Sequence, residues 1–423
     1  MKITVPYGKD YVSFFIPDEM FAGMYDSQRV EAAADSYEEI MWALDNPIGS
    51  APLEKMISAD KKVNIIIDDS SRPTPINVIL PPLLDKLGTL GIRNGNVRII
   101  AGLGSHRYMT EQELEERVGT KVYHEYEVIN SEFKKPERLV QVGSTPENIR
   151  IMVTKEVMDA DVRIGIGNIV PHPAMGWGGG GKCLFPGVTG EETVAYFHLK
   201  GSLEKENQFG KDTTPIREMM EGWVENIGLD FIINTVLTHD FKIHKIVAGH
   251  YIKAHREGIR LAKQIVGFKV IEKVDVIVVS SHPADQDLWQ SPKGIYSADH
   301  ALKGTTGGTI VLISPNDEGV GPHADYVDRI GRDDGDDLIK EALAGKPCDD
   351  DLVSLAIGNN LAKIRQRRKI VVVGDGVTTE EMRRCGFAHY NIKDLQRAVD
   401  EAAEEYPGCR IAAVSQGSET FLY

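Results

Sequence analysis

The sequence predicts an α/β protein of two domains, each a mostly parallel sheet flanked by helices, with an active site in the cleft between them. The first observation is length, because 423 residues exceed what one hydrophobic core usually supports. The second is a set of short runs rich in β-branched residues that end in polar or glycine-rich loops and alternate with helix-like segments. The third is composition: 42% hydrophobic and 26% charged residues are typical of a globular protein.

The first series of strands is expected over residues 63–67, 97–101 and 162–166. Each run leads into a loop, over residues 68–75, 102–106 and 167–190 respectively. In open α/β sheets, ligands bind at the carboxyl ends of the strands. We therefore expect these three loops to converge on one site, although about a hundred residues separate the first from the last.

The second series begins after a charge-rich helical segment at residues 250–263, with strands expected at 274–280, 309–314 and 369–373 and a helix over 336–344. We place the domain boundary near residue 268. Residues 1–268 then form an N-terminal cofactor-binding and catalytic domain, and 269–423 form a C-terminal α/β domain that closes the cleft. A last strand at 411–414 either returns to the first domain or stays in the second.

Charge and cysteine content narrow the classes of partner. A net charge of −15 repels phosphate backbones and anionic lipid, so neither nucleic acid nor a membrane surface is an expected partner. The start of the chain lacks the apolar stretch of a signal peptide, and no later run has membrane-spanning length, which predicts a cytoplasmic protein. The four cysteines are scattered without a CxxC pair, which favours reduced thiols.

The most informative loop holds four consecutive glycines, Gly178, Gly179, Gly180 and Gly181, directly before Lys182. Glycines let the backbone come close to a bulky ligand and aim its amides at a phosphate. A flexible surface turn rarely needs so dense a cluster beside a lysine. The loop therefore predicts a binding site for a phosphate-bearing cofactor.

A nucleotide-hydrolase phosphate loop is the alternative, since residues 176–182 satisfy most of that pattern and would make the protein an ATP-dependent enzyme. Two details count against it. Cys183 stands where a magnesium-binding Ser or Thr belongs, and sulfur is a poor ligand for that cation. Pro186 and Gly187 would interrupt the helix that should follow.

Several motifs occur in one order along the chain. Asp69-Ser70-Ser71-Arg72-Pro73, Gly104-Ser105-His106 and Trp289-Gln290-Ser291-Pro292-Lys293 accompany His172, Lys182 ten residues later and His198 sixteen residues after that. Together, from about residue 60 to residue 300, they resemble the signature of the nickel-pincer lactate racemase family. Each motif alone is weak, and their shared order carries the resemblance.

The resemblance implies a cofactor on Lys182: a pyridinium-3-thioamide-5-thiocarboxylate mononucleotide, joined as a thioamide, that holds square-planar nickel. His198 would be the fourth nickel ligand, and soft sulfur with imidazole suits Ni(II). The implied partners are cofactor-synthesis and nickel-insertion proteins. A noncatalytic metal store is a further alternative, although the twelve histidines form no HxH or HxxxH cluster.

The implied activity is that of an isomerase, a racemase or epimerase of a 2-hydroxy acid. Hydride removal to the cofactor gives a 2-keto acid that can be reduced on its other face, and this route avoids a carbanion beside a carboxylate. His106 and His172, in separate loops, would be the acid/base pair at the hydroxyl group, because imidazole titrates close to neutral pH.

The remaining residues would hold substrate and cofactor. Arg72 and Lys293 are expected to bind the carboxylate, and Gln290 the substrate or keto acid. Asp69 would orient Arg72 or bond the cofactor ribose. Trp289 also faces the substrate and stands where the lactate-specific pattern usually has tyrosine, so the substrate is lactate or a larger hydroxy acid. The sequence does not predict an oligomeric state.

Overall fold

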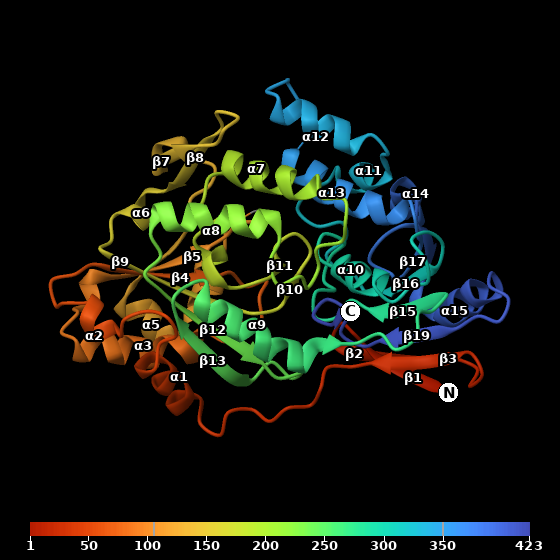
Figure 1. The fold of residues 1–423 in the computed structure, drawn as a ribbon, viewed down its shortest axis with the longest axis horizontal. Coiled ribbons are helices and arrows are strands. Elements are labelled where there is room, and N and C mark those ends of the chain that lie inside the picture. Colours follow the sequence, from red (N-terminus) through yellow and green to blue (C-terminus); the bar gives the residue numbers. More distant parts are fainter. Residues whose placement is uncertain (105, 349–350) are drawn as a thin grey trace.

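A computed structural model describes residues 1–104, 106–348 and 351–423. It confirms the α/β class, with two six-stranded sheets flanked by helices (Figure 1). The first sheet has the order β13-β12-β9-β4-β5-β6, in which β12 and β13 are antiparallel and the other pairs are parallel. Its strands are β4 (Val63–Asp68), β5 (Val97–Gly102), β6 (Glu127–Asn130), β9 (Val162–Asn168), β12 (Phe231–Leu237) and β13 (Ile243–Gly249).

Helices cover both faces of the first sheet, as its continuous apolar strands require. Along β4, Ile65 and Ile67 face one core and Ile66 faces the other, because successive side chains of a strand point to opposite faces. Helices α1 (Ser36–Asp45) and α3 (Ile76–Thr89) contribute to the first of these cores, and α8 (Pro215–Ile227) and α9 (Lys253–Val266) to the second. The carboxyl ends of the strands remain for the loops.

The second sheet has the order β18-β17-β16-β15-β19-β3, and all its pairs are parallel. Its strands are β3 (Phe21–Tyr25), β15 (Val276–Ser280), β16 (Thr309–Ile313), β17 (Lys369–Val373), β18 (Ala388–Tyr390) and β19 (Ile411–Val414). The last predicted strand therefore stays in the second sheet. β14 (Gly267–Phe268) pairs with β20 (Phe421–Leu422) beside the predicted boundary.

The start of the chain departs from the sequence-based division. We assigned residues 1–268 to one domain, but β3 pairs with β19 at the edge of the second sheet. The hairpin of β1 (Lys2–Tyr7) and β2 (Asp10–Phe15) also packs there, where Val5 and Phe14 share a core with Val278. These contacts bury apolar side chains of the hairpin against the second sheet. The boundary at residue 268 itself stays a prediction.

The two halves meet along α7 (Glu191–Ser202) and α13 (Leu352–Arg365). Leu199 packs against Leu355 and Ala356 in a small buried cluster. Asn359 Nδ2 donates to Ser202 Oγ at 3.0 Å across this contact. The remaining helices and strands are α2 (Leu53–Met56), α4 (Glu111–Val118), α5 (Thr120–Glu125), α6 (Lys155–Met158), α10 (Lys293–Asp299), α11 (Tyr326–Gly331), α12 (Gly335–Leu343), α14 (Thr379–Cys385), α15 (Leu395–Glu404), β7 (Leu139–Ser144), β8 (Arg150–Thr154), β10 (Pro171–His172) and β11 (Gly176–Trp177).

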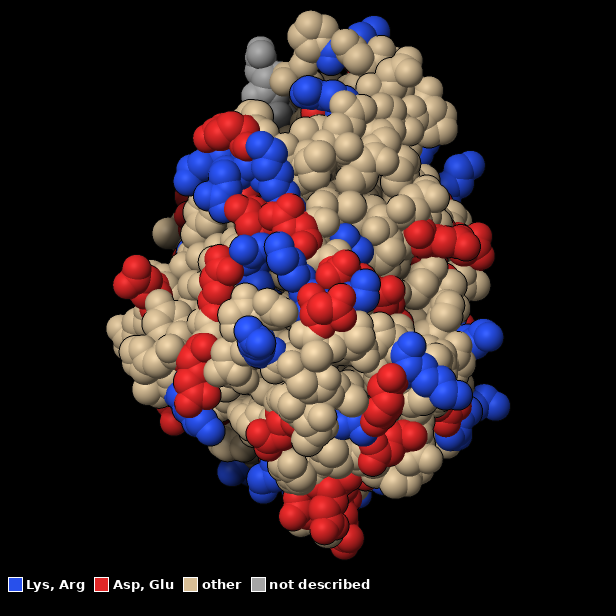
Figure 2. Space-filling view, turned by 90° about the vertical axis from the view of Figure 1, so that its left-hand side faces the viewer, with Lys and Arg blue, Asp and Glu red and all other residues tan. Residues whose placement is uncertain are grey.

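The charge on one face and the character of the helices can be described directly. On the face of the first half that Figure 2 shows, lysine and arginine side chains lie interspersed with aspartate and glutamate, without a continuous basic stripe among the residues drawn in colour. Within the described ranges, no helix combines the length and apolar character needed to cross a membrane.

Candidate active site

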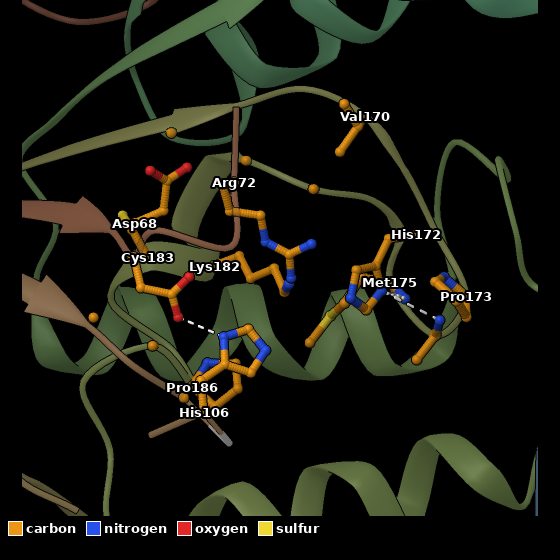
Figure 3. Close-up of a pocket in the computed structure, with 18 of the residues that line it drawn as sticks. Asp68, Arg72, His106, Val170, His172, Pro173, Met175, Lys182, Cys183 and Pro186 are labelled. Atoms are coloured by element: carbon orange, nitrogen blue, oxygen red, sulfur yellow. Dashed lines mark hydrogen bonds and ion pairs between the residues drawn. The ribbon is translucent and has the colours of Figure 1, made fainter. Parts of the chain in front are cut away.

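A cavity of about 180 Å³ lies where the loops after β4, β5 and β9 converge, as the sequence predicted (Figure 3). Another part of its wall comes from the second half, through Trp289, Gln290, Pro292 and Lys293, so the site is interdomain. The predicted site residues that line it are Asp69, Arg72, His106, His172, Gly178, Gly179, Gly180, Lys182, His198, Trp289, Gln290 and Lys293. Ser105, in the predicted loop before His106, lies outside the described residues.

Gly181 is not among the residues that line the cavity, and its contact with a cofactor stays a prediction. A Cβ at Gly181 would lie 2.7 Å from Val224 of α8, so this position is kept small by packing. Gly179 and Gly180 have φ of +73° and +65°, a backbone conformation that favours glycine. The N–H of Gly180 donates to Asn234 Oδ1 at 2.7 Å, which fixes the run.

Two buried side chains that the sequence analysis did not single out donate hydrogen bonds to carbonyls of this loop. Arg217 of α8 is fully buried, and its guanidinium donates to the carbonyl of Met175 at 2.9 Å and to that of Trp177. His255 of α9 donates from Nε2 to the carbonyl of Gly178 at 2.7 Å. The sequence feature that could have revealed Arg217 is a charged residue on the apolar stripe of an amphipathic helix.

Three basic side chains, those of Arg72, Lys182 and Lys293, line the cavity. The side-chain amine of Lys182 has no hydrogen-bond or salt-bridge partner among the described residues. Burial, and then the charge of Arg72, lower its pKa well below the ordinary value, which favours the neutral amine. Burial and Arg72 likewise lower the pKa of Lys293 to about 7. Such a cavity favours an anionic ligand.

Lys293 and Gln290 are hydrogen-bonded to each other. Lys293 is the first residue of α10, and its Nζ donates to Gln290 Oε1. The contact of Gln290 with a substrate or keto acid stays a prediction. Both side chains still line the cavity.

His106 is paired with the buried carboxylate of Asp69. Its Nδ1 donates to Asp69 Oδ2, while Asp69 Oδ1 accepts the backbone N–H of Ser71 at 3.0 Å. Burial by itself would raise the pKa of Asp69, but the neighbouring His106 and Arg72 bring it well below the ordinary value. Asp69 therefore orients His106, a role that we did not predict for it.

The other two histidines are held through Nδ1. His172 Nδ1 accepts the backbone N–H groups of Ala174 and Met175, at 3.3 and 3.2 Å. His198 Nδ1 donates to the carbonyl of Val194 at 2.8 Å, one turn earlier on α7. Burial outweighs that bond and lowers the pKa of His198 to about 4, so its Nε2 keeps a free lone pair at neutral pH.

This donor set fits a metal that is carried mainly by a bound group. Across the described residues, no cluster of three or more His, Cys, Asp or Glu side chains is arranged to hold a metal ion. The protein can offer one imidazole, His198 Nε2, whose other nitrogen is fixed by a backbone carbonyl as metal-binding histidines usually are. The remaining ligands would come from the group attached nearby.

The phosphate-loop alternative fits poorly. Lys182 lies in a single 3-10 turn (Gly180–Cys183), and the next α-helix begins only at Glu191. A nucleotide phosphate would therefore lack the helix N-terminus that such loops supply.

An aromatic wall closes the side of the cavity formed by the second half. Trp289 is 6% exposed and stacks on His323, with ring centroids 4.1 Å apart. Tyr326 meets it edge-on at 4.8 Å. Tyr296 and Phe197 line the same cavity, so a substrate tail here would meet mainly apolar surface.

Comparisons with known proteins cover nearly the whole chain. A model described as the lactate racemase N-terminal domain matches residues 7–210, and one described as the lactate racemase C-terminal domain matches residues 270–418. Lactate racemase of Thermoanaerobacterium thermosaccharolyticum is 28% identical over 386 residues, 89% of each chain. Lactate racemase of Lactiplantibacillus plantarum is 28% identical over 346 residues, 81% of each.

Solved structures agree. The lactate racemase apoprotein of T. thermosaccharolyticum superposes with a TM-score of 0.89 at 26% identity, over the full length of both chains. A crystal structure of a protein from Thermotoga maritima gives a TM-score of 0.70 at 18% identity and covers 94% of this chain and 99% of its own, so it shares the fold.

Proposed function

The chain belongs to the lactate racemase family, and from this premise we propose that it is a racemase or epimerase that inverts the hydroxyl-bearing carbon of a 2-hydroxy acid. We further propose that it works with a nickel-pincer nucleotide, a pyridinium-3-thioamide-5-thiocarboxylate mononucleotide, attached to Lys182. The proposal places the protein in the cytoplasm, together with the proteins that synthesise the cofactor and insert nickel.

The observation that carries the proposal is the state of Lys182. It is a partnerless amine of lowered pKa at the end of a glycine run, in a cavity that His198 also lines. A neutral lysine amine is the form that makes covalent bonds to a cofactor. Gly178, Gly179 and Gly180 line the cavity with backbone alone, and His198 Nε2 is free to bind a metal. When bound, that group would supply reversible acceptance of hydride.

The chain's own residues would bind and orient the substrate. Arg72 and Lys293 supply positive charge for its carboxylate. His106 and His172, which flank the space into which Arg72 and Lys182 point, would exchange the hydroxyl proton (Figure 3). Oxidation makes the 2-carbon planar, so reduction from the opposite face inverts it.

Lactate is the first substrate to try, because the two curated relatives are named lactate racemases. The aromatic wall around Trp289 and Tyr326 also suits a larger apolar substituent on the 2-carbon. Lactate and phenyllactate, compared as single enantiomers by chiral chromatography, separate these possibilities. Inversion of neither acid, by chains shown to carry the cofactor, would rule out this substrate range.

Mass spectrometry of the intact chain with metal analysis tests the proposed cofactor. The chain is made in a host that synthesises the cofactor, in native form, as Lys182→Ala, and as Lys211→Ala, which changes a surface lysine outside the cavity. We expect a nickel-containing adduct of several hundred daltons, on the order of a modified mononucleotide, in the native chain and the Lys211→Ala variant only. An unmodified, nickel-free native chain would refute the proposal.

A further inference from the structure

We propose that the two cavity histidines are held in opposite tautomers, so that in their neutral forms His106 presents a proton acceptor at Nε2 and His172 a hydrogen-bond donor at Nε2. The consequence for turnover rests on the proposed function. The assignment of the tautomers rests on the hydrogen bonds of the two rings and on the charges around them.

Both partners of His106 Nδ1 act as acceptors: Asp69 Oδ2, and Ser71 Oγ at 3.3 Å, whose own proton goes to Asp69 Oδ1. Asp69 stays ionised, because its pKa lies below the ordinary value, and an ionised carboxylate cannot donate. Ser71 holds the other carboxylate oxygen, through its backbone N–H at 3.0 Å and its hydroxyl at 2.6 Å. A proton of the His106 ring therefore sits on Nδ1, so in the neutral ring Nε2 carries the lone pair.

The partners of His172 Nδ1 are donors. The backbone N–H groups of Ala174 and Met175 both point at this atom, and a backbone N–H can only donate. A proton on Nδ1 would face both of them. The ring proton of His172 therefore sits on Nε2.

The surroundings also keep the His172 ring neutral. Burial comes first, and then the charges of Lys182, Arg72 and Lys293, with His198 beyond them, lower its pKa well below the ordinary value. All of these neighbours are basic groups, so none of them would stabilise an imidazolium.

The two histidines then have different tasks in the resting chain. A substrate hydroxyl beside His106 can pass its proton to Nε2, and the Asp69 carboxylate can balance the imidazolium that forms. An oxygen beside His172 instead receives a hydrogen bond from a neutral ring, which polarises a carbonyl without giving up the proton. For His172 to accept a proton, Nδ1 must hold one, and the turn at residues 172–175 must release its two amide bonds.

Nitrogen NMR of the full-length chain without cofactor reads the tautomers directly. Histidine is labelled with 15N in the ring, and long-range 1H–15N correlations show which nitrogen carries the proton. His106→Gln and His172→Gln each remove one set of signals and so assign them. In the neutral rings we expect the proton on Nδ1 of His106 and on Nε2 of His172. The same tautomer in both rings, or a charged His172, would overturn the proposal.

Asp69→Asn supplies the matched change. Ser71 fixes one side-chain oxygen at position 69, so the new amide nitrogen faces His106 and donates to Nδ1. The proton of His106 should move to Nε2, while the His172 signals stay unchanged. An unchanged His106 pattern would overturn the role of Asp69. In the loaded enzyme the wrong tautomer should lower kcat by about 10⁴-fold, the size of the effect in a serine protease.

The order of events needs a separate measurement on loaded enzyme. Racemisation has an equilibrium constant of one, so kcat/KM is the same in both directions and only the first turnover can differ. Acid quenching of that turnover should release more 2-keto acid from one enantiomer than from the other. Equal release would refute the division of tasks. The NMR result does not depend on activity, so its failure and failure of the proposed function are distinguishable.

Discussion

Replacing Arg217 with methionine tests whether its hydrogen bonds to the segment before the glycine run stabilise the protein. Arg217 is fully buried, and it donates to the carbonyls of Met175 and Trp177 from the helix below. Methionine is apolar and cannot donate to either carbonyl. Glu221, 3.7 Å from Arg217, keeps its second partner, Arg256, at 2.9 Å. The expected loss of stability therefore comes mainly from the two carbonyls that lose their donor.

The magnitude follows from that count. Each buried carbonyl left without a donor costs about 1–3 kcal/mol. The variant also avoids burying a guanidinium, which offsets part of the loss. We expect the free energy of unfolding to fall by about 3 kcal/mol. Arg217→Lys keeps the charge but offers its donors from one nitrogen where the guanidinium uses two, so its free energy of unfolding should fall by an intermediate amount.

Urea unfolding followed by circular dichroism measures these differences. Arg260→Met is the control, because Arg260 is 57% exposed and pairs only with Glu257 on its own helix among the salt bridges described. Its effect should stay within about 0.5 kcal/mol. A loss below about 1 kcal/mol in Arg217→Met would refute the reasoning, since it would mean that the two carbonyls find other donors.

Three further changes test other parts of the site. Gly176→Ala places a Cβ 2.0 Å from the carbonyl oxygen of Lys211 at a φ of +72°, so the variant should show a lowered Tm in a thermal melt, and an unchanged Tm would contradict the packing. His198→Ala should keep the adduct on Lys182 by intact mass but lose nickel by metal analysis, and retained nickel would argue against the ligand role. Because the pKa of Lys293 is about 7 and the lysine is charged only below it, the cofactor-free chain should bind sulfate more weakly as pH rises through 7, as measured by calorimetry. Lys293→Met should remove that pH dependence, and its persistence would assign the dependence to another group.

The sequence by itself determined the class of fold and the membership of the site. Runs such as residues 65–67 and 370–373 are apolar throughout, as expected of strands buried on both faces. Since loops at the carboxyl ends of parallel strands share one edge of the sheet, the sequence could predict that His106, His172 and Lys182 converge. The resemblance to a known family rested on the order of the motifs along the chain.

Only the tertiary structure decided which distant residues contact one another. The Asp69–His106 pair joins residues 37 positions apart, and the hydrogen bond from Arg217 to Met175 joins residues 42 positions apart. The pairing of β3 with β19 spans almost the whole chain. Each contact depends on how separate elements meet in space, so it leaves no periodic trace in the sequence. Hydrophobic periodicity reports which face of an element is buried, whereas a hydrogen bond between distant loops is set by sheet order and loop conformation, which local residues do not encode.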